Sequence, residues 1–202
     1  MASQLRKPTG WFGSLVLTRF MNLGNRRLIG STLATLGLSP EHHVLEIGFG
    51  GGSALSNLAG FVSTGEVSGI DFSPEMVRRA ERRFRRQIAE GRMRVQLGDV
   101  SRLPFPDAAF DRVFTVNTIY FWPDAMQGLE EIRRVLKGDC LAAVSIRSRE
   151  KMEKVAVSRY GFRLFSPQEL ADLMRQAGFH DIRVDHRDQG KFVDSVIVVG
   201  VR

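Results

Sequence analysis

Hydrophobic residues along this chain follow two patterns, and the two patterns alternate. Short apolar runs bounded by turn residues predict buried strands, whereas longer stretches with an apolar residue at every third or fourth position predict helices. The runs predict strands over residues 43–47, 66–70, 93–97, 111–116, 140–146, 181–187 and 192–200. Because helical stretches lie between most of these runs, we expect one α/β domain, in which a seven-stranded, mostly parallel, Rossmann-like sheet carries helices on both faces.

The first predicted strand contains a carboxylate near its end and runs into a series of glycines. In the segment Val44–Gly52, Glu46 is followed by Gly48, Gly50 and Gly52, and a helical pattern begins directly afterwards. Glycines allow a ligand to approach the backbone closely because no Cβ stands in the way. We therefore predict a cofactor-binding loop between this strand and the next helix.

The spacing of these glycines bears on the kind of cofactor. Dinucleotide-binding loops have the pattern G-x-G-x-x-G, whereas the third glycine position falls on Ser53 here. Glu46 also lies at the carboxyl end of the strand, where a carboxylate repels an anionic pyrophosphate and attracts a cationic group. A nicotinamide oxidoreductase is therefore the less favoured class of enzyme.

A second carboxylate, Asp71, ends the second predicted strand. It lies about twenty residues after the glycine loop, where a doubly wound sheet places the acid that binds ribose hydroxyls. Ser73 as N-cap, Pro74 at the first helical position and Glu75 in the first turn predict that a helix starts directly afterwards. A carboxylate that faces two hydroxyls accepts two charge-assisted hydrogen bonds, so Asp71 is a candidate ribose ligand.

The pattern Glu46-x-Gly48-x-Gly50-x-Gly52 after an apolar strand resembles the first motif of the class I S-adenosylmethionine-dependent methyltransferases, of the small-molecule, type 11-like kind. Further segments resemble later motifs of this family in the same order, so the resemblance extends from about residue 44 to residue 200. These segments are residues 67–76, 95–100, 110–117, 133–139 and 165–179.

One segment departs from the family pattern. The turn before the fifth strand is usually Pro-Gly-Gly, whereas this chain has Gly138-Asp139-Cys140. The difference affects a turn and no expected site residue. The resemblance also implies that the last strand of the sheet runs antiparallel to the others.

The resemblance implies S-adenosylmethionine as the cofactor and S-adenosylhomocysteine as its product. In this arrangement Glu46 would stabilise the methionyl amine, Asp71 would hold the ribose and Asp99 would accept from the adenine amino group. Phe72 and Met76 would pack on the adenine. The predicted cofactor-binding residues are Glu46, Gly48, Phe49, Gly50, Gly52, Asp71, Phe72, Met76, Asp99, Val100 and Asn117. No metal site is expected, since the four histidines are scattered.

The segment Asn117–Pro123 follows the fourth predicted strand and is expected to shape the acceptor site, because ligands in open α/β sheets bind outside the carboxyl ends of the strands. Asn117 could bind the methionyl end of the cofactor. Tyr120 is the candidate catalytic residue because its hydroxyl could face the pocket, whereas Phe121 and Trp122 fit core packing equally well. Methyltransferases that modify exocyclic amines of nucleic acids carry Asn/Asp-Pro-Pro-aromatic here. Both prolines are missing in this chain, which argues against methylation of adenine or another exocyclic amine. The connection after the fifth strand is too short for a separate recognition domain, which favours a small-molecule acceptor.

Residues 1–40 are predicted to form a helical cap, and residues 41–202 the methyltransferase domain. Apolar residues recur at helical spacing in two stretches, one from Trp11 to Phe20 and one from Leu28 to Leu36. Related small-molecule methyltransferases suggest a lid over the pocket. We expect the second helix to pack on the sheet and residues 11–25 to gate the pocket. The alternatives are two helices that only cover the sheet edge, or an interfacial helix at a bilayer.

The net charge of +7 at pH 7 comes largely from arginine. Six arginines are expected on one face of a single helix whose opposite face is apolar. They are Arg78, Arg79, Arg82, Arg83, Arg85 and Arg86. A solvated outer face is the favoured interpretation, since no aromatic residues that would stack on bases alternate with them. The alternative is a methyltransferase that acts on RNA or a phospholipid and docks through this face.

The remaining features favour a cytoplasmic enzyme. No run of about 18 apolar residues occurs, so no transmembrane segment is predicted, while peripheral membrane contact stays an alternative. The first residues lack the pattern of a secretory signal. Cys140 is the single cysteine and is expected in a buried strand. A non-catalytic cofactor-binding module is the last alternative, and the intact Glu46, glycines and Asp71 argue against it.

Overall fold

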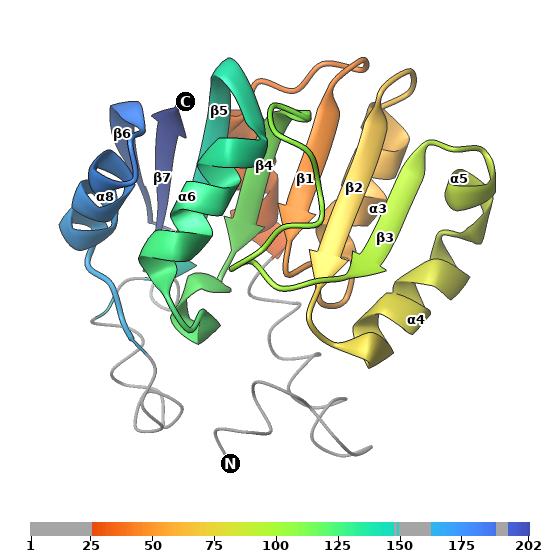
Figure 1. Cartoon of the computed structure of the whole chain (residues 1–202), viewed down its shortest axis with the longest axis horizontal. Coiled ribbons are helices and arrows are strands. Elements are labelled where there is room, and N and C mark those ends of the chain that lie inside the picture. The colour runs from red at the N-terminus through yellow and green to blue at the C-terminus, as the bar shows by residue number, and fades with distance from the viewer. Residues whose placement is uncertain (1–25, 148, 150–162, 189–193) are drawn as a thin grey trace.

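The computed structural model describes residues 26–147, 149, 163–188 and 194–202. Seven strands form one sheet in the order β3-β2-β1-β4-β5-β7-β6 (Figure 1). The strands are β1 (His43–Ile47), β2 (Glu66–Asp71), β3 (Met93–Leu97), β4 (Phe110–Val116), β5 (Leu136–Arg147), β6 (His180–Asp188) and β7 (Asp194–Val201). Strand β7 pairs antiparallel with β5 and β6, whereas the other pairs are parallel. The mostly parallel sheet and its antiparallel last strand are confirmed.

Helices cover both faces of this sheet (Figure 1). They are a helical segment over residues 26–35, α3 (Ser53–Phe61), α4 (Pro74–Arg83), α5 (Arg85–Ala89), the 3₁₀ turn η1 (Ile119–Phe121), α6 (Ala125–Val135) and α8 (Pro167–Gln176). Segment 26–35, α3 and α4 bury apolar side chains in one core, and α6 and α8 do so in a second core. Among the described residues, no helix is long and apolar enough to cross a bilayer.

Only the second helix of the predicted cap lies in the described part of the chain. Leu28 of segment 26–35 and Leu36 directly after it are fully buried, and the Thr32 hydroxyl lies 2.6 Å from the Ser145 hydroxyl of β5. This segment therefore packs on the sheet. The predicted gate over residues 11–25 lies outside the described residues and stays a prediction.

The helix that the six arginines were expected to share is two helices. Helix α4 ends at Arg83 and α5 begins at Arg85, because Phe84 between them leaves helical geometry with φ −107° and ψ 20°. The Phe84 side chain is buried in the core that α3 and α4 share with the sheet. The prediction of a single helix was therefore wrong. The predicted solvent exposure of all six arginines is confirmed.

Strand β5 begins earlier than predicted. Helix α6 ends at Val135 and β5 starts at the next residue, so the turn expected at residues 138–140 lies within the strand. Asp139 has φ 56° there, and the register between β4 and β5 shifts between Phe110 and Arg112. An irregular strand start thus replaces the usual Pro-Gly-Gly turn.

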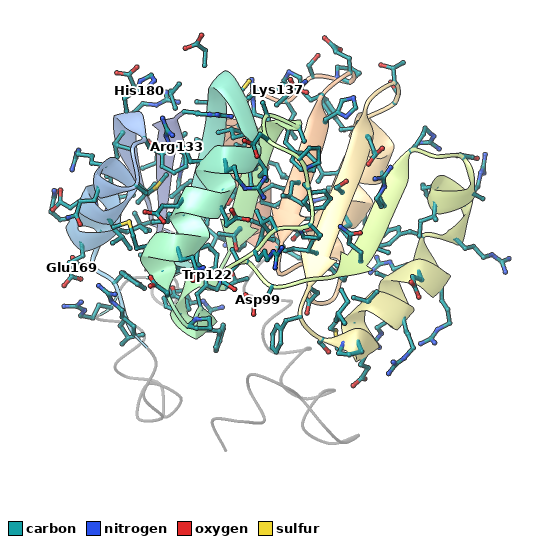
Figure 2. The ribbon with its side chains drawn as sticks, in the orientation of Figure 1. Asp99, Trp122, Arg133, Lys137, Glu169 and His180 are labelled. Atoms are coloured by element: carbon teal, nitrogen blue, oxygen red, sulfur yellow. The ribbon has the colours of Figure 1, made fainter. Side chains whose placement is uncertain are left out.

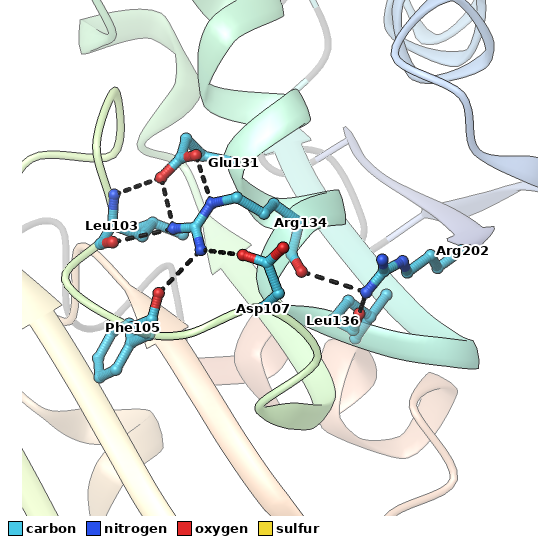
Figure 3. A network of polar contacts seen from close by, with 7 residues as sticks. All are labelled: Leu103, Phe105, Asp107, Glu131, Arg134, Leu136 and Arg202. Carbon is cyan, nitrogen blue, oxygen red and sulfur yellow. Dashed lines mark hydrogen bonds and ion pairs between the residues drawn. The ribbon is translucent and has the colours of Figure 1, made fainter.

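Arg134 of α6 binds the loop that connects β3 and β4 (Figure 3). Its guanidinium donates to the carboxylates of Glu131 and Asp107 and to the carbonyls of Leu103 and Phe105, over 2.7–3.0 Å. Glu131 also accepts from the Leu103 N–H at 2.6 Å. The Arg134 hydrogen bonds lower the pKa of Glu131, because they favour its ionised form. One side chain of α6 therefore fixes the path of a segment that runs back over the sheet.

We expect Arg134→Met to lower the free energy of unfolding by about 3 kcal/mol, because it removes charge-assisted hydrogen bonds and leaves two carboxylates without their cation. The control is Arg175→Met, which removes an exposed ion pair with Asp172 and should cost about 0.5 kcal/mol or less. Urea denaturation followed by circular dichroism measures both. Equal costs for the two variants would contradict a structural role of the Arg134 network.

Candidate cofactor site

The glycine loop joins the end of β1 to the start of α3. Gly48, Gly50 and Gly52 have φ of 73°, 49° and 69°, a region that L side chains rarely adopt. The Gly48 N–H donates to the Ile70 carbonyl at 2.8 Å, and a Cβ at Gly48 would lie 2.5 Å from the Thr118 Cγ2. Around Gly50, no described atom lies within 4 Å of the corresponding position. The loop thus packs tightly between β2 and the turn after β4, and it is open at Gly50.

Glu46 of β1 faces the start of α3 and is 4% exposed. The Leu55 N–H, in the first turn of α3, hydrogen-bonds the Glu46 carboxylate. This contact replaces the side-chain cap that Gly52 does not provide. Within the described residues, the Glu46 Oε2 atom has no hydrogen-bond partner. An unpaired polar atom is costly to bury, so this oxygen is suited to a donor supplied by a ligand.

The environment of Glu46 favours its neutral form in the free protein. Burial raises its pKa from 4.5 to about 8, the nearby charge of Asp71 adds to the increase, and the Leu55 hydrogen bond opposes it. A cationic ligand group beside Oε2 would reverse this balance and favour the carboxylate. The site is therefore matched to an ammonium group and not to an anion.

Asp71 at the end of β2 connects the glycine loop and the start of α4 through hydrogen bonds to both. Its Oδ2 accepts from the Gly50 N–H at 2.8 Å, and its Oδ1 accepts from the Ser73 N–H at 2.9 Å. The side chain is 5% exposed, and burial raises its pKa while the two N–H groups oppose the increase. Each carboxylate oxygen keeps a further lone pair for a ligand hydroxyl. The predicted N-cap Ser73 and first-turn Pro74 are confirmed.

The apolar side chains around Asp71 divide into exposed and buried ones. Phe72 is 41% exposed and Leu97 is 54% exposed, and Leu97 pairs with Asp71 in the register of β2 and β3. Met76 and Val100 are 5% and 6% exposed and fill the two cores beneath this edge. Free apolar surface for a flat ring therefore comes from Phe72 and from Leu97. The sequence interpretation missed Leu97, and its signal is an apolar residue at the last position of an edge strand.

Two further predicted residues lie at this end of the sheet. The Phe49 side chain is buried in the core and is 4% exposed, so only its backbone belongs to the open part of the loop. Asp99 is exposed, and its Oδ1 accepts from the N–H and the hydroxyl of Ser101 at 2.9 and 2.8 Å. Figure 2 shows Asp99 and Trp122 at the same end of the molecule, with His180 and Lys137 at the opposite end.

Asn117 and Tyr120 both bind the end of β5. The Asn117 N–H donates to the Ser145 carbonyl at 2.8 Å, and its Oδ1 accepts from the Arg147 N–H at 3.1 Å. The Tyr120 hydroxyl accepts from the Arg147 N–H at 2.6 Å and donates to the Arg147 carbonyl at 3.1 Å. Burial raises the pKa of Tyr120 above its ordinary value. These contacts favour a structural role for Tyr120, and its catalytic role stays a prediction.

Known proteins share this architecture. The model of the methyltransferase domain family matches residues 45–144. The uncharacterized methyltransferase YdaC of Bacillus subtilis is 29% identical over 81% of this chain and 86% of its own length. A SAM dependent methyltransferase from Aquifex aeolicus, known from a crystal structure, is 26% identical in sequence. Its structure superposes on this one with a TM-score of 0.70, and the match covers 86% of this chain and 89% of that chain. This chain belongs to the class I S-adenosylmethionine-dependent methyltransferases.

A further relative of this methyltransferase is the O-methyltransferase cnsE of Penicillium expansum, which is 31% identical over 73% of this chain. The match spans 56% of that relative's length. The predicted family, enzyme class and cofactor are confirmed, and the nicotinamide alternative is set aside.

The residues around the glycine loop fit S-adenosylmethionine. We propose that the unpaired Glu46 Oε2 receives the methionyl ammonium, that Asp71 binds the ribose hydroxyls, and that Phe72 and Leu97 flank the adenine. Asp99 would accept from the adenine amino group. The two carboxylates lie at the ends of neighbouring strands, so they can hold two parts of one extended ligand.

Binding of S-adenosylhomocysteine at pH 7 should release close to one proton, because the ligand ammonium ionises a Glu46 that is mostly protonated in the free protein. Calorimetry in two buffers with different ionisation enthalpies measures this number. In Glu46→Gln, the release should disappear and the affinity should fall. Equal release in both proteins would contradict the pairing of Glu46 with the ammonium.

The same pKa shift links Glu46 to the stability of the free protein. Its folded-state pKa is raised, so its contribution to stability is fully present below about pH 4.5 and is lost as the pH rises through about 8. Glu46→Gln should remove this part of the pH dependence in urea denaturation without ligand.

Asp71→Ala should weaken S-adenosylhomocysteine binding at least tenfold, on the order of 1.4 kcal/mol or more, since it removes a ligand for two hydroxyls and an anchor of the loop. The matched control is Glu66→Ala, which removes a carboxylate from the opposite end of β2. Calorimetric titration of the folded variants is the measurement. Unchanged affinity in Asp71→Ala would contradict the assignment.

Proposed function

We propose that this methyltransferase transfers a methyl group from S-adenosylmethionine to a small-molecule acceptor. The acceptor would lie beside the glycine loop, at the turn after β4 and the end of β5. The observation that carries this proposal is the close packing of that loop on the turn, where a Cβ at Gly48 would meet the Thr118 side chain. A ligand in the loop and an acceptor at the turn are therefore neighbours.

Two further points support a small acceptor. The connection between β5 and α8, residues 148–166, is too short for a separate recognition domain. The name of the relative from Penicillium expansum describes an O-methyltransferase. We therefore favour a hydroxyl of a small organic molecule as the group that is methylated.

The protein's own contribution would be alignment. When bound, the cofactor supplies a methyl group on a positively charged sulfur. Glu46 and Asp71 would fix its two ends, while Phe121 and Trp122, both partly exposed, would border the acceptor beside Asn117. Holding two reactants in line can supply effective molarities of about 10⁵–10⁸ M. Alignment can thus provide much of the rate increase. The bond from the methyl carbon to sulfur would break as the bond to the acceptor oxygen forms, and the hydroxyl proton would pass to water.

Tyr120→Phe tests whether the phenol acts as a base. Its hydroxyl is occupied by the Arg147 backbone, so we expect kcat to stay within about threefold and its pH profile to stay unchanged. The free energy of unfolding should fall by about 1 kcal/mol from the lost hydrogen bonds. A loss of kcat by a hundredfold or more, with cofactor affinity intact, would restore the catalytic role.

Release of S-adenosylhomocysteine tests the proposed function directly. The protein is incubated with S-adenosylmethionine and, in separate reactions, a panel of small hydroxylated aromatic and aliphatic compounds, total RNA, and phospholipid vesicles. We expect release with members of the small-molecule panel and, at S-adenosylmethionine concentrations below the wild-type KM, at least tenfold slower release with Asp71→Ala. Turnover only on RNA or vesicles, lost in Arg82→Glu with Arg86→Glu, would contradict the proposal and support docking through the arginine face.

A further inference from the structure

An open groove lies between the helical segment 26–35 and the edge strand β6, far from the glycine loop. Its volume is about 760 Å³. It is lined by Arg27, Gly30, Ser31, Ala34, Thr35, Arg183, Asp185 and Arg187. Strands β4, β5 and β7 lie between β1 and β6, which places the groove about 20 Å from the cofactor loop across the sheet. The groove is therefore a different place from the cofactor site.

The groove is open because neither wall carries a large apolar side chain. On segment 26–35, the groove is lined by Arg27 and by small residues such as Gly30 and Ala34, whereas Leu28 and Ile29 are buried against the sheet. Strand β6 alternates in the same way: Ile182 and Val184 pack in the α8 core, whereas the charged residues at 183, 185 and 187 face the groove. Polar side chains alone line the strand wall.

The charges in the groove are unbalanced. Three arginines face one carboxylate, that of Asp185. The Arg187 Nη2 lies 3.3 Å from Asp185 Oδ2 and donates to the Thr35 hydroxyl at 3.5 Å, while its buried Nε has no partner among the described residues. Arg27 and Arg183 form no ion pair with any of the described carboxylates. Two positive charges therefore have no counter-charge in the groove.

The dimensions and chemistry of the groove select a class of ligand. Its volume lies in the range of small-molecule sites, about 300–1,000 Å³. Guanidinium groups present paired N–H donors that match the oxygens of a phosphoryl group, and the hydroxyls of Ser31 and Thr35 add neutral donors. We propose that this groove binds a phosphorylated small molecule, whose two negative charges balance the arginines.

Charge also argues against the preceding part of this chain, residues 1–25, as the occupant. Residues 1–25, which precede the helical wall, contain Arg6, Lys7 and Arg19 and no carboxylate. They cannot supply the missing negative charge. A polynucleotide would need a longer cationic track, and the cluster of six exposed arginines on α4 and α5 lies next to β3 at the opposite edge of the sheet (Figure 1). A compact phosphorylated ligand fits better.

Calorimetric titration with inorganic pyrophosphate tests this site, in the presence of saturating S-adenosylhomocysteine so that the cofactor site is occupied. We expect the wild-type protein to bind pyrophosphate, and Arg183→Gln with Arg187→Gln to weaken binding at least tenfold. The control, Arg78→Gln with Arg82→Gln, removes the same charge from α4 and should change the affinity less than twofold. Ala34→Phe fills the groove without changing charge and should also weaken binding at least tenfold.

The proposal would be overturned by no pyrophosphate binding by the wild type, by equal weakening in both arginine pairs, or by unchanged affinity in Ala34→Phe. A single-stranded RNA that binds more tightly than pyrophosphate and depends on Arg183 and Arg187 would also overturn it, in favour of a polynucleotide. S-adenosylhomocysteine titration of each variant checks the fold. None of these measurements uses methyl transfer, so the result is independent of the proposed function.

Discussion

Two carboxylates buried side by side under the glycine loop are the constraint on which this site depends. Glu46 and Asp71 belong to neighbouring strands and point to the same face of the sheet, where burial disfavours the charge of both. Backbone N–H groups from the loop and from the starts of α3 and α4 offset part of that cost. The loop can bring its N–H groups this close only with a backbone that glycine tolerates. The glycine backbone therefore makes it possible to bury both carboxylates, because it brings N–H donors close to them.

The other side of the site, the turn after β4, is connected through β5 to segment 26–35. The Ser145 carbonyl accepts from the Asn117 N–H, and the Ser145 hydroxyl contacts Thr32. Strand β5 thus links the turn that borders the acceptor to the helix that forms one wall of the groove. The two ligand sites are separated by strands, yet they rest on one shared element.

The parts of the structure that follow from local pattern could be predicted from sequence. Apolar runs located the strands, and two of them, at residues 43–47 and 93–97, have the predicted bounds. The capping role of Ser73 also followed from local chemistry. The break at Phe84 could not be predicted, because the ring leaves the helical path to reach a core made by other elements. The orientation of Tyr120 was missed for the same reason, since its partner Arg147 is distant in sequence. The periodicity of a sequence shows which residues form an apolar face. It does not show which residues, distant in sequence, a side chain will contact in the fold.

The position of β7 has a consequence for how the chain folds. Strand β6 precedes β7 in the sequence, but β7 lies between β5 and β6 in the sheet. During folding, β6 therefore has no neighbouring strand to pair with until β7 inserts beside it. Until then, β5 and β6 each present an open backbone edge, and such edges pair readily with other chains. Folding thus passes through a stage at which two strands have an open edge, and insertion of one late strand closes both edges.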